Sequence, residues 1–310
     1  MYRILICLQG VLDEKTIESA VSFKKIVFSR NYKVDVIFLA WKTSNFINKS
    51  NEIKIIYLED TASTFTKDSE RLINLNRQIK TTAFLLDKFK NKYDYILKLR
   101  SDILVSDTCK FKKEFITAVN IPKIWILNIP TFSPRILNPI FLKYHFSDWF
   151  IGGTPNRLSK FLKLEEIDES KLIENTPFYY KNHIFWRKAQ NEQLIWSTGW
   201  QKKVNKKEKL KIFNKKIQKI NLKNSLDFAL YLNNNFYILP FLISGLKSIK
   251  HFNSTISWYK NSYSIFHVNF IETFFINNGY IFLSVLYIPF FRYIALNIKK
   301  LSKKSIKIKF

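Results

Sequence analysis

The chain has 310 residues and a formal net charge of +27, with 47% hydrophobic and 16% aromatic residues. This composition excludes a disordered chain and allows a sizeable core in one large domain or two modest ones. The only two cysteines, Cys7 and Cys109, do not indicate a disulfide framework or a zinc site, which fits a reducing cytoplasm.

Strand and helix patterns alternate over the first 105 residues. The first apolar run is too short for a secretory signal and leads into Asp13 and Glu14, so it predicts a strand. The predicted strands are Ile4–Leu8, Val34–Ala40, Ile53–Leu58 and Tyr93–Leu99, and the predicted helices are Glu14–Ser29 and Leu72–Phe89. This alternation predicts a Rossmann-like α/β fold, in which helices flank a mostly parallel sheet.

The following residues, 106–160, are less regular. A strand is predicted at Trp125–Ile129, and five prolines between positions 122 and 155 predict loops. Two further helices are predicted, near Asn156–Leu164 and near Arg187–Trp196. Residues 1–200 are therefore interpreted as an α/β domain, and residues 201–310 as a basic, aromatic C-terminal extension.

Three polar segments follow predicted strands: Gln9-Gly10, the loop after Ala40, and Arg100-Ser101-Asp102. In a parallel sheet the carboxyl ends of the strands meet at one edge, where ligands bind. We therefore expect these three segments to lie at the same edge. Asp102 could hold a hard divalent cation beside a diphosphate, although a three-residue motif taken alone is better explained as a loop cap.

The helix before the fourth strand carries Arg77, whose guanidinium presents a fork of donors that matches a phosphate. Further along, Ser147-Asp148-Trp149-Phe150 with Gly152-Gly153 suits a sugar-binding loop, because aromatic rings stack on sugars and glycine allows close approach. Glu192 could act as a general base toward an acceptor hydroxyl. A solvated helix face or a buried turn would explain each of these features equally well.

Taken together, the order and spacing of these segments resemble the WavE lipopolysaccharide-synthesis family over roughly residues 1–200. The segments that carry the resemblance are Gln9-Gly10, Thr16, Asn76-Arg77-Gln78-Ile79, Lys98-Leu99-Arg100-Ser101-Asp102, Ser147-Asp148-Trp149-Phe150 with Gly152, and Glu192-Gln193.

The resemblance implies an A-type glycosyltransferase fold and transfer of a sugar from a nucleotide-sugar donor to a lipopolysaccharide or another surface glycan. The residues that it implies for donor binding are Gln9, Gly10, Thr16, Arg77, Arg100 and Asp102. Glu192 is then the favoured base and Asp148 a ligand of sugar hydroxyls, with these two roles exchangeable.

A divalent cation, Mn²⁺ or Mg²⁺, is expected at Asp102, with His267 as a second candidate ligand. The A-type fold usually carries Asp-x-Asp, and here Arg100 occupies the first position. Arg100 could itself offset the charge of a diphosphate and reduce the need for a cation.

The charge is concentrated in the C-terminal extension, where residues 201–310 hold 20 basic and 3 acidic residues. Lysines alternate with apolar residues over 202–219 and again over 280–310, as in segments that lie in an anionic membrane interface. The apolar run over 280–291 is too short to span a bilayer unless it continues through Arg292. We expect a cytoplasmic protein, peripheral at the inner face of the membrane, with a lipid-linked or oligosaccharide acceptor.

Three alternatives stay open. High charge alone would suit a nucleic-acid-binding protein, but only nine of the 51 basic residues are arginine and no nucleic-acid-binding module is recognisable. A nucleic-acid partner is therefore not expected. The second alternative is a non-catalytic component of a polysaccharide assembly complex. The third is a transferase that moves an alditol phosphate from a nucleotide donor.

Overall fold

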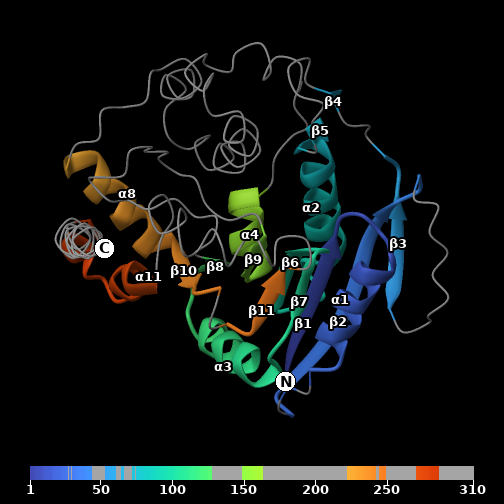
Figure 1. Cartoon of the computed structure of the whole chain (residues 1–310), viewed down its shortest axis with the longest axis horizontal. Coiled ribbons are helices and arrows are strands. Elements are labelled where there is room, and N and C mark those ends of the chain that lie inside the picture. The colour runs from blue at the N-terminus through green and yellow to red at the C-terminus, as the bar shows by residue number, and fades with distance from the viewer. Residues whose placement is uncertain are drawn as a thin grey trace, which may run out of the picture.

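The computed structural model describes residues 1–26, 28, 30–43, 53–60, 64–65, 72–73, 75–127, 149–162, 222–241, 244–248 and 270–285. These residues form an α/β fold with helices on both faces of a seven-stranded sheet (Figure 1). The predicted α/β class with a mostly parallel, helix-flanked sheet is thereby confirmed.

The strand order of the sheet is β10-β8-β9-β6-β1-β2-β3. Every neighbouring pair is parallel except the two pairs that involve β9, which is antiparallel to both β6 and β8. The strands are β1 (Tyr2–Gln9), β2 (Tyr32–Trp41), β3 (Lys54–Leu58), β6 (Tyr95–Arg100), β8 (Ile124–Leu127), β9 (Phe150–Gly153) and β10 (Phe236–Leu239). Two small antiparallel pairs accompany the sheet: β4 (Thr64–Phe65) with β5 (Leu72–Ile73), and β7 (Ile103–Val105) with β11 (Leu246–Ser248).

Two apolar cores lie on opposite faces of this sheet. The first core packs α1 (Glu14–Lys24) and α3 (Thr108–Val119) against the sheet. The second packs α2 (Leu75–Phe89), α4 (Pro155–Leu162), α8 (Leu222–Asn235) and α11 (Phe270–Asn277) against the other face. Because β1 is covered on both faces, its residues from Ile4 to Leu8 are apolar without interruption and fully buried.

The predicted strands and helices of the first 105 residues are present, with shifted ends. The helix expected over Glu14–Ser29 ends at Lys24, and the one expected over Leu72–Phe89 begins at Leu75 because Leu72 and Ile73 form β5. The strand expected at Trp125–Ile129 is β8, and the helix expected near Asn156–Leu164 is α4. The helix expected near Arg187–Trp196 lies outside the described residues.

The interpretation of Gly152-Gly153 as part of a loop is wrong. Both glycines belong to β9, a strand whose four residues are all buried. A Cβ atom on Gly152 would lie 2.6 Å from Cε3 of Trp125, so the indole of β8 leaves room only for glycine at this position. Packing of the sheet explains the glycine without reference to a sugar.

Part of the region after residue 200 belongs to the same fold as the residues before it. β10 is an edge strand of the main sheet, and β11 pairs with β7. Within the described part of the chain, no helix is long and apolar enough to cross a membrane.

Candidate functional site

The strand order reverses direction between β1 and β6. From β1 the chain adds β2 and then β3 on one side, whereas β6 pairs with the other side of β1. In open parallel sheets, ligands bind outside the carboxyl ends of the strands at such a point. Gln9 of β1 is in register with Leu39 of β2 and with Arg100 of β6. The expectation that the three polar segments share one edge is therefore confirmed.

The turns after β1 and β6 are joined closely at this edge. The backbone N–H of Ser101 donates to the carbonyl oxygen of Gln9 at 2.9 Å. Gly10 has φ +146°, a conformation that L side chains rarely adopt, and a Cβ atom there would lie 3.2 Å from Cβ of Ser101 and nearer still to its Oγ. Glycine at position 10 is thus required by this packing.

Arg100 and Asp102 form a two-pronged ion pair directly after β6. Arg100 Nε donates to one carboxylate oxygen of Asp102 at 3.0 Å, and Nη2 donates to the other at 2.9 Å. The guanidinium carbon lies 5.5 Å from the ring centre of Trp149, and the backbone N–H of Arg100 donates to the Trp149 carbonyl at 3.0 Å. The two hydrogen bonds to Asp102 and the contact with the Trp149 ring therefore orient the Arg100 side chain.

Arg77 repeats this arrangement on the other side of β1. It lies in the first turn of α2, and its Nε donates to Asp60 at 2.7 Å while Nη2 donates to the second oxygen of the same carboxylate. Asp60 follows β3, and Thr43, which follows β2, donates its hydroxyl to Asp60 at 3.2 Å. The Arg77 guanidinium carbon lies 5.8 Å from the ring centre of Trp41, the last residue of β2. Each arginine is thus held by one aspartate beside one tryptophan.

The two arginine–aspartate pairs are connected through Gln9. Thr81, one turn after Arg77 on α2, donates its hydroxyl to the Gln9 side-chain oxygen and is also within 2.9 Å of the Arg77 carbonyl oxygen. Gln9 in turn lies opposite Arg100 in the sheet. The structure therefore brings together four of the predicted donor-binding positions, which are Gln9, Arg77, Arg100 and Asp102, at the turn that contains Gly10.

In both pairs the aspartate side chain is more buried than the arginine side chain. The exposed fraction of the side chain is 33% for Arg100 against 15% for Asp102, and 24% for Arg77 against 12% for Asp60. The arginine side chain is therefore the more accessible partner of each pair.

A buried cationic residue lies below the Arg100 position. Lys98 is two residues earlier in β6, so its side chain projects from the same face of the sheet, and it is only 2% exposed. It lies opposite Cys7 of β1. Burial raises the pKa of the Cys7 thiol, and the charge of Lys98 opposes that rise. Cys7 is consequently a protonated core residue rather than a nucleophile.

Thr16 performs a structural task at the start of α1. Its backbone N–H donates to the Asp13 carboxylate at 2.8 Å, and its hydroxyl accepts from the Asp13 backbone N–H at 2.9 Å. These reciprocal bonds form a capping box, which satisfies N–H groups that the first helical turn leaves unpaired. Thr16 is also buried, and its proposed part in donor binding stays a prediction.

The expected divalent cation does not fit the described residues of this site. A hard cation needs several oxygen ligands, and Asp102 already directs both carboxylate oxygens to Arg100. No group of three or more histidine, cysteine, aspartate or glutamate side chains that could hold a metal occurs among the residues that the structure describes. His267, the second candidate ligand, lies outside those residues, as do Asp148 and Glu192.

Three residues that contribute to this arrangement were not predicted as site residues: Asp60, Trp41 and Thr81. A signal for two of them was present: Trp41 opens the loop after Ala40 that was predicted to lie at this edge, and Asp60 follows the predicted strand Ile53–Leu58. Thr81 gave no such signal, since its role depends on how α2 packs on the sheet. Trp149 was noticed as a sugar-stacking residue, whereas here it lies beside the Arg100 guanidinium.

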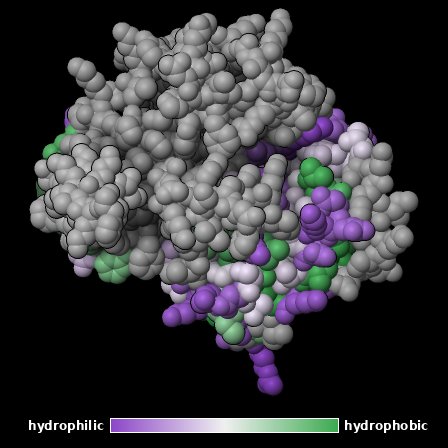
Figure 2. All heavy atoms as spheres, viewed as in Figure 1, coloured by the Kyte–Doolittle hydropathy of each residue, from purple (hydrophilic) through white to green (hydrophobic). Residues whose placement is uncertain are grey.

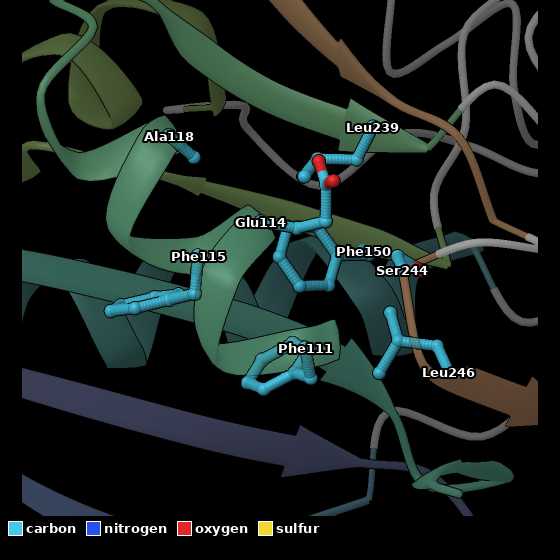
Figure 3. Close-up of a pocket in the computed structure, with 8 residues that line it drawn as sticks. All are labelled: Phe111, Glu114, Phe115, Ala118, Phe150, Leu239, Ser244 and Leu246. Carbon is cyan, nitrogen blue, oxygen red and sulfur yellow. The ribbon is translucent and has the colours of Figure 1, made fainter. Parts of the chain in front are cut away.

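A separate hollow lies on the face of the sheet that α1 and α3 cover. Figure 3 shows its lining, to which α3 contributes four residues and the ends of β9 and β10 contribute Phe150 and Leu239. Its walls are almost entirely apolar, and burial raises the pKa of Glu114 at its rim, against the opposing charge of Lys113. Of the segments singled out in the sequence, only the proposed sugar-binding segment contributes to this hollow, through Phe150, and none of the predicted donor-binding residues lines it. We therefore place the candidate site at the arginine pairs.

A scan against models of known protein families and a search of curated proteins found no match to this chain.

Proposed function

We propose that this protein is a nucleotide-sugar-dependent glycosyltransferase with an A-type fold, related to the WavE lipopolysaccharide-synthesis family. One observation carries the proposal. Two oriented arginines, Arg77 and Arg100, flank the turn at Gly10 where the strand order reverses. An oriented guanidinium matches the geometry of phosphate oxygens, and a nucleotide-sugar donor presents two adjacent phosphates.

The proposed chemistry requires a diphosphate to leave. The acceptor hydroxyl oxygen bonds to the anomeric carbon of the sugar as the bond from that carbon to the diphosphate oxygen breaks. The electron pair of the broken bond stays on the diphosphate, and a base removes the hydroxyl proton. Arg77 and Arg100 would stabilise the charge that develops on the leaving group, because donors that are already oriented need no reorganisation during the reaction.

The remaining site assignments rest on the sequence. Glu192 is proposed as the base and Asp148 as a ligand of sugar hydroxyls, and a lipid-linked or oligosaccharide surface glycan is proposed as the acceptor. An acceptor of this kind fits a protein that works in the cytoplasm at the inner face of the membrane, where the lysine-rich extension would lie against anionic lipid.

Binding of a nucleotide tests the proposal first. The full chain is titrated with UDP, GDP, CDP and ADP while its thermal unfolding is followed, with a duplex DNA and a single-stranded RNA as comparison ligands. We expect one diphosphate to raise the Tm, since a ligand that binds only the folded state stabilises it. No response to any diphosphate, together with salt-sensitive binding to nucleic acid, would instead support a nucleic-acid-binding protein.

Substitution of Glu192 tests the chemical step. Glu192→Gln should leave nucleotide affinity unchanged and lower turnover by about 10²-fold or more, because a base contributes at that scale. Transfer of sugar from the nucleotide-sugar that corresponds to the stabilising diphosphate is the measurement. Unchanged turnover would remove Glu192 from the proposed role.

A further inference from the structure

We propose that this protein pairs with a second copy of itself through β3, so that two seven-stranded sheets join edge to edge in an antiparallel, two-fold dimer. β3 is the last strand of the sheet, and among the described residues its one neighbouring strand is β2 (Figure 1). Such a dimer goes beyond the proposed function and does not depend on it.

The backbone groups on the outer side of β3 come from every second residue. The backbone N–H of Lys42 donates to the carbonyl oxygen of Leu58 at 2.9 Å, so the backbone groups of Leu58 point toward β2. Backbone groups of successive strand residues point to alternate sides, so those of Ile56 also point toward β2, whereas those of Ile55 and Tyr57 point outward. The outer side therefore presents the N–H and carbonyl groups of two residues that lie two positions apart.

An antiparallel copy of β3 satisfies these groups in one register. In an antiparallel pair, residues that exchange backbone hydrogen bonds alternate with residues that face each other without them. When Ile56 lies on the two-fold axis, Ile55 of each copy is opposite Tyr57 of the other, and a pair of backbone hydrogen bonds forms on each side of the axis. Because both copies use the same strand, the pairing closes as a dimer.

The side chains of β3 suit the same register. Ile55 and Tyr57 lie on one face of the sheet, where each cross-strand contact joins an aromatic ring to a β-branched side chain, a favourable combination. On the other face Ile56 meets its own copy. Tyr57 is 41% exposed and both isoleucines are only partly buried, so the dimer would cover apolar surface. The strand has no proline and no charged residue after Lys54, the features that commonly prevent such pairing at an exposed edge.

Charge favours the antiparallel orientation. β3 begins at the exposed Lys54 and is followed by Glu59, whose side chain is 70% exposed although it pairs with Lys42. An antiparallel copy brings the Lys54 end of each strand to the Glu59 end of the other, and a carboxylate can accept from a second lysine. The edge strand β10 differs, because the side chain of Asn277 already occupies its backbone groups at Ile238.

The mass of the full chain in solution tests the pairing. One chain has a mass of 37.1 kDa, and we expect sedimentation velocity to show a species of twice that mass that grows with concentration up to about 100 µM. Tyr57→Pro removes an outward N–H and keeps the hydrogen bonds to β2, since an edge strand accepts proline where its N–H faces solvent. It should raise the Kd of the dimer by about 10-fold or more. Tyr57→Phe keeps the N–H and the ring and should dimerise as the parent does. A monomer throughout this range, or a dimer of equal Kd in Tyr57→Pro, would overturn the inference.

A cysteine on the axis tests the register without the use of proline. In a Cys109→Ser background, which removes the exposed native thiol, Ile56→Cys places two thiols in a directly opposed pair. The Cα atoms of such a pair lie about 4.5 Å apart, within the range of a disulfide. Lys54→Cys is the control, because its two copies would lie about 13 Å apart along the strands. We expect mild oxidation to cross-link Ile56→Cys at least several-fold more than Lys54→Cys. Equal cross-linking of the two variants, or none at Ile56→Cys, would contradict pairing about this axis.

Discussion

Gly10 is the residue whose identity the candidate site constrains most closely. Its φ of +146° and its contact with Ser101 both exclude a Cβ atom. We expect Gly10→Ala to lower the free energy of unfolding by about 1–3 kcal/mol, the usual cost of a side chain in a sparsely populated backbone region. Thermal or urea unfolding of the full chain measures this change.

Ser101→Ala provides a control for the steric part of that cost. The double variant Gly10→Ala with Ser101→Ala removes the Oγ atom that the new methyl would meet, so it should recover part of the lost stability. Equal stability of the parent and of Gly10→Ala would show that the turn after β1 is not packed against Ser101.

The sequence predicted those residues of the site that lie at the end of a predicted strand, because the carboxyl ends of parallel strands meet at one edge. Gln9, Gly10, Arg100 and Asp102 follow predicted strands, and the structure brings them to one edge. The partner of each residue could not be predicted. That Asp102 holds Arg100 depends on side-chain orientation after a tight turn, which strand and helix patterns do not report.

At the scale of elements, the sheet edge at β10 shows how the fold protects an exposed strand. Asn277, the last residue of α11, donates its side-chain N–H to the Ile238 carbonyl at 2.8 Å. It accepts from the Ile238 backbone N–H at 3.0 Å. Its amide therefore takes the place that a neighbouring strand would occupy, which blocks pairing with another chain.

Removal of this amide should destabilise the edge. Asn277→Ala leaves the N–H and carbonyl groups of Ile238 without their partner, and we expect a loss of about 1–3 kcal/mol in the free energy of unfolding. Asn278→Ala is the matched control, because Asn278 is exposed and only caps the Phe274 carbonyl. Equal effects of the two substitutions in urea unfolding would contradict the proposed protection of the edge.

Elements with a strong repeating pattern were predictable, and elements defined by tertiary contacts were not. The helix α3 was missed among the prolines and loops expected over 106–160, although Asp107 caps it and Phe111 and Phe115 are buried one turn apart. The strand β9 was missed because four residues are too few to show alternation, and its glycines suggested a loop. The neighbouring indole of Trp125 explains the glycine at 152, and no local pattern carries that information.

At the scale of the whole molecule, an apolar surface lies where the described chain ends. We name it the aromatic ridge, and it consists of Phe274, Tyr280, Phe282 and Leu283, each 47–56% exposed. Phe274 and Tyr280 stack with ring centres 6.3 Å apart. Gly279, at φ +79°, ends α11 and turns Tyr280 back toward it. Figure 2 shows hydrophobic residues at the left edge of the view, where Figure 1 places α8 and α11.

The sequence after the ridge favours an anionic membrane as its partner. Residues 286–310 hold seven basic residues and no acidic one, so identical ridges from two copies would bring like charges together. Aromatic side chains beside lysines are typical of surfaces that lie at the level of lipid headgroups. The ridge thus extends the proposal of a peripheral membrane protein to particular side chains.

Replacement of the ridge should release the protein from lipid. We expect Phe282→Ser with Leu283→Ser to lower the fraction bound to phosphatidylglycerol-containing vesicles several-fold, since about 25 cal/mol per Å² of apolar burial is lost. Flotation of the full chain measures binding. Tyr57→Ser, an exposed aromatic residue on the strand at the opposite edge of the sheet, should bind as the parent does. Unchanged flotation of the double variant would exclude the ridge from membrane contact.

The most direct test of the whole account locates the nucleotide on the protein. Hydrogen exchange of the full chain is measured with and without the diphosphate that stabilises it most. We predict slower exchange in the peptides that contain Gln9-Gly10, Arg77 and Arg100-Ser101-Asp102, because these segments surround the proposed diphosphate site. Protection confined to the hollow beside α3, or no protection at the ends of β1 and β6, would contradict it.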